Sequence, residues 1–343
     1  MSIPVHVVTG FLGAGKTTLL NRLLASGAFS NTAVVINEFG DVGIDHLLVD
    51  TTRAGDTMIE LSDGCLCCTV RSDLVDTLLQ IGERIDAGAS LDRVIIETTG
   101  LADPAPVLQA VMASSGVRDR FHVASVIAVV CAATGLAAID GHAEARAQVA
   151  LADRIVLTKT DIEPASAELV ATLAAQNPLV SPVDAQSPGF VLALDDAALT
   201  SADAPAETHD HHHHHHDVNR HDTAVQAFTL THDAPIPEAT VEMFTDLLRS
   251  TMPRELLRMK GIVRTVENPD RPLVIHGVRS VFHPPVRLES WNGRTPETRL
   301  VVIARNGSRE RIEGLFGAFT GQVAPDRPDR QALTDNPLAI PGM

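Results

Sequence analysis

Three of the chain's four cysteines lie within one short stretch, at Cys65, Cys67 and Cys68. Thiolates at this spacing can bind a borderline or soft metal ion such as Zn²⁺. Three sulfurs do not complete a four-coordinate site, so we expect a fourth ligand, which could be Glu38, water or a histidine. A redox-active cluster and buried, inert cysteines are the alternative interpretations. The fourth cysteine, Cys131, ends an apolar run and is predicted to be a core residue.

A second group of residues, GFLGAGKT at positions 10–17, matches the phosphate-binding loop pattern without a mismatch. Backbone N–H groups of such a loop cradle phosphates, while Lys16 would reach the β- and γ-phosphates and Thr17 would hold Mg²⁺. A predicted strand precedes the loop and a predicted helix follows it, which makes a chance glycine turn the weaker interpretation. The predicted nucleotide-binding residues here are Gly10, Gly13, Ala14, Gly15, Lys16, Thr17 and Thr18.

A third candidate group follows the apolar run at residues 94–96: Glu97 comes directly after the run, and Gly100 lies three residues further on. This shape is typical of a Walker B strand with its switch glycine, although the acid is Glu instead of Asp. Glu97 would reach Mg²⁺ through water or orient the attacking water, and Gly100 would donate its N–H to the γ-phosphate. Lys16, Glu97 and Gly100 are therefore the candidate catalytic residues. Glu38 lies where GTPases carry their first switch segment, and a solvated acidic loop is the alternative.

The segment Thr158-Lys159-Thr160-Asp161 follows another predicted strand and resembles the guanine-recognition motif Asn-Lys-x-Asp. Asp161 would accept hydrogen bonds from guanine N1–H and the 2-amino group, and the stem of Lys159 would pack over the base. Thr158 departs from the usual Asn, which weakens the prediction of guanine but leaves the discriminating Asp. An ordinary polar strand end is the alternative interpretation. We expect GTP to be the nucleotide.

The predicted elements position these groups at one edge of a sheet. The cysteine cluster lies on a turn between a predicted strand at residues 58–61 and a predicted helix at residues 70–85. Because nucleotide sites in such folds lie at the carboxyl ends of parallel strands, the cluster should share an edge with the phosphate loop. A helix N-terminus also lowers the pKa of nearby thiols, which favours metal binding.

Another candidate metal-binding tract lies between two structured parts of the chain. It has no apolar face to bury, so we predict a disordered linker whose imidazoles collect Zn²⁺, Ni²⁺, Co²⁺ or Cu²⁺. An engineered purification tag is the alternative, which the internal position and the flanking His and Asp residues argue against. The predicted ligands are His211, His212, His213, His214, His215 and His216.

The predicted fold class is α/β, with a P-loop NTPase domain on a mostly parallel sheet, then the His-rich linker and a small α+β C-terminal domain. In that last domain we expect strands near residues 227–230, 261–265, 272–276, 281–288 and 299–303, and helices at 237–249 and 309–319. The predicted boundaries are 1–196 for the nucleotide-binding domain, 197–222 for the linker, 223–324 for the C-terminal domain and 325–343 for a disordered tail.

Composition limits the partners. The formal net charge of −16 disfavours nucleic acid, whose phosphates it would repel. No apolar run has the roughly 18 residues of a membrane helix, and we see no signal peptide at the N-terminus. Metal-binding thiols must stay reduced, so we expect a cytoplasmic protein.

Together, the motifs resemble those of the CobW-like family of P-loop GTPases, which are metallochaperones for zinc and cobalt. The ordered set carries the resemblance: GFLGAGKTT, VINEFG, ELSDGCLCCTV, IIETTGLADP and the His-rich segment before a small C-terminal domain. The resemblance implies a metal site coupled to Mg²⁺ and GTP, with Lys16, Thr17 and Glu97 serving the nucleotide. It also implies that Cys65, Cys67 and Cys68 hold the transferred metal near Glu38.

The leading hypothesis is a GTP-hydrolysing metallochaperone that transfers zinc to a client metalloprotein, with a homo-oligomer left open. A rival with the same chemistry delivers cobalt for cobalamin synthesis or to a cobalt enzyme such as nitrile hydratase, since Zn²⁺ and Co²⁺ accept the same ligands. A non-catalytic metal store built on the histidines is a rival of another class. A small-molecule kinase is a third, for which no acceptor-site signature is found.

Overall fold

The computed structural model of the chain describes residues 2–26, 29, 31–37, 57–60, 69–178, 180–187, 190, 225–291, 293, 295–305 and 307–321. The predicted linker at 197–222 and the predicted tail at 325–343 lie outside the described residues, so the domain boundaries stay predictions. No helix in the described ranges is both long and apolar enough to cross a membrane.

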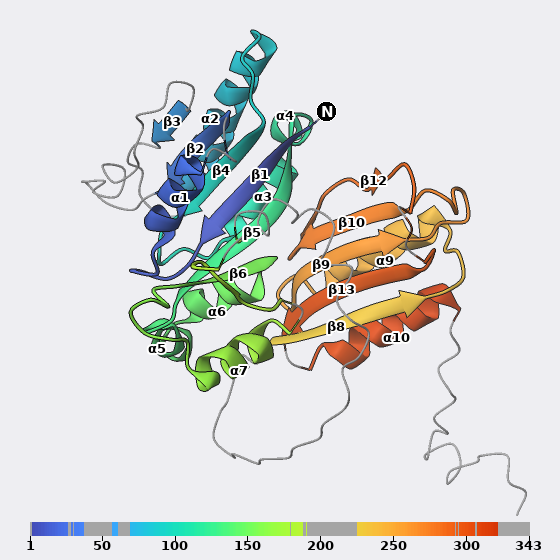
Figure 1. The fold of residues 1–343 in the computed structure, drawn as a ribbon. Helices are drawn as coiled ribbons and strands as arrows, with labels where there is room; N and C mark the ends of the chain where they lie inside the picture. Colours follow the sequence, from blue (N-terminus) through green and yellow to red (C-terminus); the bar gives the residue numbers. More distant parts are fainter. Residues whose placement is uncertain are drawn as a thin grey trace, which may run out of the picture.

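The first domain is built on a sheet whose seven described strands are all parallel, in the order β3-β2-β4-β1-β5-β6-β7 (Figure 1). Its central strands are near-continuous apolar runs, as expected for strands that are buried on both faces. Parallel pairing places all their carboxyl ends at one edge. The strands are β1 (Ile3–Thr9), β2 (Thr32–Asn37), β3 (Thr57–Glu60), β4 (Arg93–Thr98), β5 (Phe121–Cys131), β6 (Arg154–Thr158) and β7 (Val183–Asp184).

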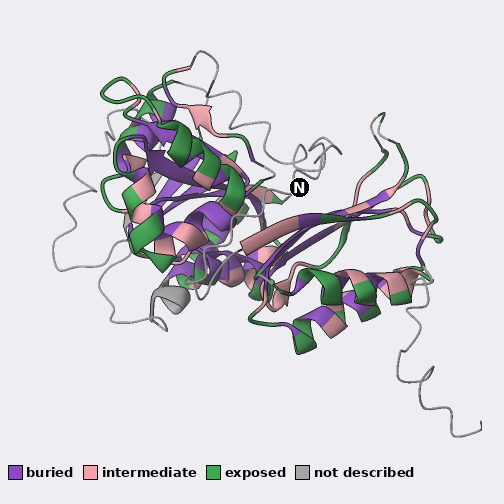
Figure 2. Cartoon of the chain, turned by 90° about the horizontal axis from the view of Figure 1, so that it is seen from below, coloured by how far each residue is buried: buried purple, intermediate pink, exposed green. Residues whose placement is uncertain are grey.

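Helices cover both faces of this sheet, and Figure 2 shows the buried residues concentrated between the layers. Val8 packs with Leu20 of α1 on one face, and its neighbour Val7 packs with Leu78 of α2 on the other. This alternation along β1 is that of a strand buried on both sides. The helices are α1 (Lys16–Ala25), α2 (Thr69–Asp86), α3 (Ala105–Ala113), α4 (Ser115–Arg118), α5 (Gly135–Gly141), α6 (Ala143–Ala150) and α7 (Ala167–Gln176).

The second domain is an antiparallel sheet with α9 and α10 against one face (Figures 1 and 2). Phe244 of α9 and Phe316 of α10 lie in one core with Leu300 and Val302 of β13. The two domains confirm the predicted α/β nucleotide-binding fold followed by a small α+β domain, while the His-rich linker stays a prediction. The elements are β8 (Val225–His232), α9 (Glu238–Thr251), β9 (Leu256–Val263), β10 (Leu273–Val278), β11 (Val281–Phe282), β12 (Val286–Arg287), β13 (Thr298–Arg305) and α10 (Arg309–Thr320).

The single strand predicted over residues 281–288 is wrong. Two short strands, β11 and β12, occupy this segment, and Pro284 and Pro285 lie between them. Proline has no N–H to donate to a neighbouring strand, so the ladder is interrupted there.

A buried charge cluster joins the two domains. Asp153, in the turn before β6, is 3% exposed, and its Oδ2 accepts from Arg258 Nη2 at 2.7 Å and from the Val126 N–H at 2.8 Å. Lys260 Nζ lies 3.4 Å from Oδ1. Burial raises the pKa of Asp153, but Arg258 and then Lys260 outweigh it and hold this pKa well below its usual range. Strand β9 begins at Leu256, ahead of its predicted start at residue 261, and carries both of these cations.

Apolar contacts and a second ion pair extend the interface. Leu257, Val278 and Ile303 of the second domain belong to the same buried core as α3 of the first. Arg279, in the turn after β10, donates to Asp103 Oδ2 in the loop between β4 and α3. The second domain therefore reaches the loop that follows Glu97.

We expect Asp153→Asn to lower the free energy of unfolding by about 3–5 kcal/mol at pH 7, because it leaves the buried Arg258 and the half-buried Lys260 without their counter-charge. The depressed pKa of Asp153 stabilises the fold above about pH 4, and this contribution is lost as the pH falls toward the folded-state pKa. The deficit of the variant should therefore shrink below about pH 4. Urea unfolding between pH 7 and pH 3 measures both effects.

Asp119→Asn is the matched control, because Asp119 is exposed and lies 4.0 Å from Arg118. Such surface pairs contribute about 0–1 kcal/mol. Equal shifts of the urea midpoint in the two variants would contradict the prediction.

Candidate nucleotide and metal site

The phosphate loop connects the end of β1 to the start of α1. Gly15 caps this helix with φ 93°, a backbone conformation that favours glycine. Lys16 is the first residue of α1, and its Nζ lies 3.5 Å from the Phe11 carbonyl oxygen. N–H groups at a helix N-terminus attract phosphate oxygens. One strand–loop–helix unit thus carries Gly10, Gly13, Ala14, Gly15, Lys16, Thr17 and Thr18.

Thr17 and Glu97 meet beneath this loop. The Thr17 hydroxyl donates to Glu97 Oε1 at 2.9 Å, and the two residues are 8% and 4% exposed. Strands β1 and β4 are neighbours, with Val8 opposite Glu97, and one residue further Thr98 Oγ1 donates to Thr9 Oγ1 at 2.8 Å. A hydroxyl and a carboxylate oxygen are hard donors, so this pair fits Mg²⁺.

The loop after β4 lies against the phosphate loop. A Cβ at Gly100 would come 2.7 Å from the Leu12 backbone nitrogen, so a larger residue would have to displace the backbone. Gln148 of α6 holds this loop, because its Nε2 donates to the Gly100 oxygen at 3.1 Å and to the Ala102 oxygen at 3.0 Å. Gln148 is not among the site residues predicted from the sequence. Gln148 lies three residues after the buried Ala145, on the same face of the helix. A single amide on this apolar face is the feature of the sequence that could have indicated its role.

The predicted guanine segment is tied to the phosphate loop. Thr158 Oγ1 donates to the Ala14 oxygen at 2.5 Å, so the hydroxyl that replaces the usual amide has a partner. Lys159 has φ 58°, and its Nζ donates to the Gly13 oxygen at 2.9 Å. The two segments therefore form one continuous rim.

Asp161 is exposed at this rim, beside the loop after β7, which is not among the predicted site segments. Its Oδ1 accepts from Gln186 Nε2 at 3.3 Å. Thr160 Oγ1 donates to Asp184 Oδ1 at 2.7 Å, and Asp184 also accepts from the Gln186 N–H at 2.8 Å. Strand β7 has only two residues, which is too short for an alternating pattern that would predict the strand and the loop after it. Gln186 of this loop is thus a hydrogen-bond partner of Asp161.

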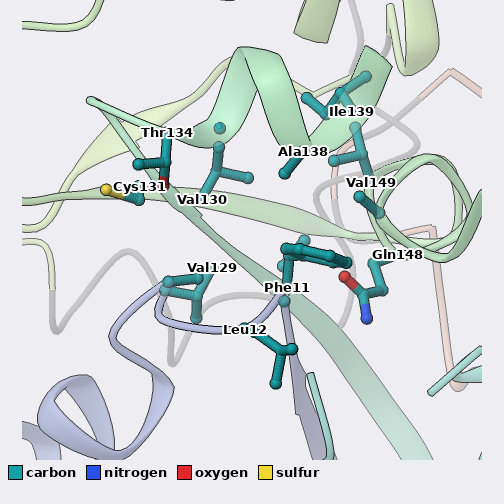
Figure 3. Close-up of a pocket in the computed structure, with 15 residues that line it drawn as sticks. Phe11, Leu12, Val129, Val130, Cys131, Thr134, Ala138, Ile139, Gln148 and Val149 are labelled. Carbon is teal, nitrogen blue, oxygen red and sulfur yellow. The ribbon is translucent and has the colours of Figure 1, made fainter. Parts of the chain in front are cut away.

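Cys131 ends β5 beside the phosphate loop. It is buried and forms no disulfide, as predicted for a core residue. Burial raises the pKa of its thiol, but hydrogen bonds from Thr134 and Ala133 and the charge of Lys159 outweigh burial and lower this pKa. Cys131 and Phe11 help to line a small cavity of about 20 Å³ (Figure 3).

The predicted metal ligands lie outside the described residues: Glu38, Cys65, Cys67, Cys68 and the histidines at 211–216. Within the described ranges, no three His, Cys, Asp or Glu side chains are grouped so that they could hold a metal ion. The described strands nevertheless show where the segments with Glu38 and the three cysteines begin. Strand β2 ends immediately before Glu38, and β3 and α2 flank the cysteine segment.

Family models match both domains of the chain. Residues 4–182 match the CobW/HypB/UreG nucleotide-binding domain. Residues 225–320 match the cobalamin synthesis protein CobW C-terminal domain.

Curated relatives support the same grouping. Zinc chaperone YjiA of Escherichia coli (strain K12) is 32% identical over 322 residues, which are 92% of this chain and 98% of that protein. Zinc-regulated GTPase metalloprotein activator 1 of Saccharomyces cerevisiae is 31% identical over 191 residues, which are 50% of this chain and 44% of that protein.

A solved structure is also similar over most of the chain. The crystal structure of Zn(II)-bound YjiA GTPase from E. coli has a TM-score of 0.64 at 26% identity and covers 93% of this chain and 99% of that one. The Zn(II)-bound variant of that GTPase in which one glutamate and two cysteines are replaced by alanine gives the same values. The chain thus belongs to the CobW/HypB/UreG family and combines its nucleotide-binding domain with the CobW C-terminal domain.

Proposed function

We propose that this protein is a GTP-hydrolysing metallochaperone that binds zinc at its cysteine cluster and passes it to client metalloproteins. The contact between Thr17 and Glu97 carries the proposal, because it joins the phosphate loop to the acid of the neighbouring strand at 2.9 Å. The segment that contains the cysteine cluster begins after β3, and the carboxyl end of β3 lies at the same edge of the sheet as the phosphate loop.

Each nucleotide-binding residue has a chemical role in this proposal. Lys16 at the start of α1 contacts the β- and γ-phosphates, together with the N–H groups of the phosphate loop. Gly100 lies against Leu12 of the phosphate loop, and its N–H would donate to the γ-phosphate. Lys159 and Asp161 would bind the guanine base at the rim that their segment forms with the phosphate loop.

Thr17 and Glu97 would hold Mg²⁺, directly or through water. When bound there with GTP, the ion supplies positive charge that offsets the developing charge on the phosphate oxygens. Glu97 is 4% exposed and already accepts one hydrogen bond, so its carboxylate is fixed in one orientation. A fixed carboxylate can orient the attacking water without reorganising during the reaction.

The strand order brings the metal segment within range of the nucleotide. From the cysteine side, the order is β3-β2-β4-β1. Neighbouring strands are about 4.8 Å apart, so the end of β3 lies about 10 Å from the end of β4 and about 14 Å from the phosphate loop. Glu38 follows β2, which lies between β3 and β4. We propose that it connects the two sites and serves as a zinc ligand beside Cys65, Cys67 and Cys68.

Zinc is the proposed cargo. Thiolates bind both Zn²⁺ and Co²⁺, so ligand chemistry alone does not separate them. The relatives YjiA and metalloprotein activator 1 are named for zinc, which favours zinc in this chain. Cobalt is the second candidate, because the C-terminal domain matches one named for cobalamin synthesis.

The histidines at 211–216 are proposed to collect metal for the cysteine site. A store built on these histidines alone would need neither Lys16 nor Glu97, yet the chain has a complete phosphate loop with its acid. We propose that the protein works in a reducing compartment such as the cytoplasm, where thiols stay available. Whether it acts as a homo-oligomer does not alter these roles.

We expect zinc to bind about tenfold more tightly with a non-hydrolysable GTP analogue than with GDP. By linkage, zinc should increase the affinity for the analogue relative to GDP by the same factor, which corresponds to about 1.4 kcal/mol. The measurement is competition against a chelator of known zinc affinity. Equal affinities with both nucleotides would overturn the coupling.

The zinc test should use a chain in which His211–His216 are replaced by serine. The glutamate and cysteine variant of the E. coli relative is itself Zn(II)-bound, so zinc content alone does not identify the cysteine site. In this background, Cys67→Ser should weaken zinc binding about 100-fold, since each of four ligands supplies roughly a quarter of ~10–16 kcal/mol. Cys131→Ser is the matched control and should leave zinc affinity unchanged.

We expect Asp161→Asn to weaken GTP binding about 10- to 100-fold, because charge-assisted hydrogen bonds contribute roughly 1.5–3 kcal/mol. The asparagine amide can donate to the extra oxygen of xanthine, so affinity for xanthosine triphosphate should rise. Fluorescent-nucleotide titrations measure both affinities. Glu163→Gln makes the same charge change at an exposed neighbouring position and should have little effect. A similar loss of GTP affinity in both variants would exclude the role of Asp161.

A further inference from the structure

Gln148 directs both of its amide donors at the loop that follows Glu97. It is 1% exposed on α6, and Nε2 lies 3.1 Å from the Gly100 oxygen and 3.0 Å from the Ala102 oxygen. A buried amide is costly unless it is hydrogen-bonded, and the NH₂ group has two hydrogens to donate. Both hydrogens of the amide are therefore directed at one short segment, residues 100–102.

The orientation of this amide follows from its surroundings. With the amide reversed, Oε1 would face two carbonyl oxygens, which repel it. Figure 3 shows the Gln148 side chain reaching from its helix toward Phe11 and Leu12 of the phosphate loop. Gln148 thus acts as a pair of donors aimed at the loop after β4.

Gly100 is the residue on which this restraint has the largest effect. Glycine has the most conformational freedom, and a Cβ here would come 2.6 Å from Leu12 Cδ2. A hydrogen bond to the Gly100 carbonyl fixes the planar peptide that follows it and so removes much of that freedom. Gln148 therefore restrains the loop after β4, which packs against Leu12 of the phosphate loop.

The helix that carries Gln148 is itself anchored at its end. Asn177 Nδ2 donates to the Val149 oxygen at 3.0 Å and to the Ala152 oxygen at 2.9 Å. Arg258 of the second domain donates to the Leu151 oxygen and pairs with Asp153. The support of Gln148 therefore comes from both domains, which is what a precise position requires.

We propose that Gln148 is a positioning residue for GTP hydrolysis, which fixes the backbone of Gly100 and Ala102 where it faces the γ-phosphate. The proposal rests on the role of Gly100 given in the proposed function. Gln148 acts through the loop and does not touch the nucleotide. Its contribution should therefore appear with GTP and be absent with GDP, which has no γ-phosphate.

The test compares Gln148→Met with the wild-type full-length chain. Methionine keeps a similar volume and removes both donors. We expect kcat for GTP hydrolysis to fall about 10- to 100-fold, as for misplacement of a reacting group by about 1 Å. Affinity for GDP should stay within about twofold, and a thermal melt should show a cooperative transition.

Gln109→Met is the matched control. Gln109 lies on α3 and donates to the Val278 oxygen at 3.5 Å across the domain interface, so it does not contact this loop. Its kcat should match the wild type. A normal kcat in Gln148→Met, or equal losses of GDP affinity and kcat, would overturn the positioning role.

Gln148→Glu adds a readout that a merely structural role would not produce. A buried carboxyl facing two carbonyl oxygens has a raised pKa and regains one O–H donor when it is protonated. Its kcat relative to wild type should therefore rise as the pH is lowered from about 8.5 to 6. A constant ratio across this range would count against the proposal.

Should both Gln148 variants lose their cooperative melt, hydrogen–deuterium exchange on the wild-type chain decides. Replacing GDP by a non-hydrolysable GTP analogue should slow exchange at residues 98–103 and also at 143–153, because Gln148 joins them. Slowing at 98–103 alone would overturn the proposal. Absence of GTP hydrolysis by the wild-type chain would instead contradict the proposed function.

Discussion

Parallel pairing in the first sheet is the constraint on which the site depends. Strand β4 is inserted between β2 and β1, and Glu97 lies opposite Ile36 on one side and Val8 on the other. A register shift of one residue would turn the Glu97 side chain to the other face of the sheet and away from Thr17. Because both neighbouring strands are apolar and buried, such a shift would also expose two cores. The hydrophobic pattern of the strands thus fixes the geometry of the polar pair.

The second domain is held by charges that are expensive to bury. Replacing a buried ion pair by apolar residues is often neutral or stabilising, so the Asp153 cluster is weak evidence for stability. Its consequence here is orientation. Arg258 pairs with Asp153 just beyond α6, and Arg279 pairs with Asp103 just beyond Gly100. Asp103 lies in the loop after β4, whereas Asp153 follows the helix whose Gln148 holds that loop. Rotation of the second domain would therefore disturb the loop directly and through α6.

The sequence was most informative where short motifs combine with long periodic elements. The phosphate loop, Glu97 and the parallel sheet followed from apolar runs that each end in a polar group. The division of residues 281–288 into two strands was not predicted, although Pro284 and Pro285 are visible in the sequence. The residues around these prolines still fitted the pattern of a single strand. Arg258, Lys260 and Gln148 were missed for a different reason. Their burial depends on contacts with segments far away in sequence, and local periodicity holds no information on these contacts.

In the proposed function, hydrolysis acts on zinc only through a difference in affinity. Zinc–thiolate sites bind with about 10–16 kcal/mol, whereas coupling between sites typically supplies about 1–3 kcal/mol. Loss of the γ-phosphate therefore cannot release zinc into water. It can reverse the preference between two sites of similar strength, which is a shift of roughly 5- to 150-fold. Transfer must then proceed by ligand exchange inside a complex, where thiolates or imidazoles of the client replace the cysteines one at a time. The lifetime of the GTP-bound state determines how long the chaperone retains its zinc before this exchange, and that lifetime depends on how firmly Gln148 holds the loop at Gly100.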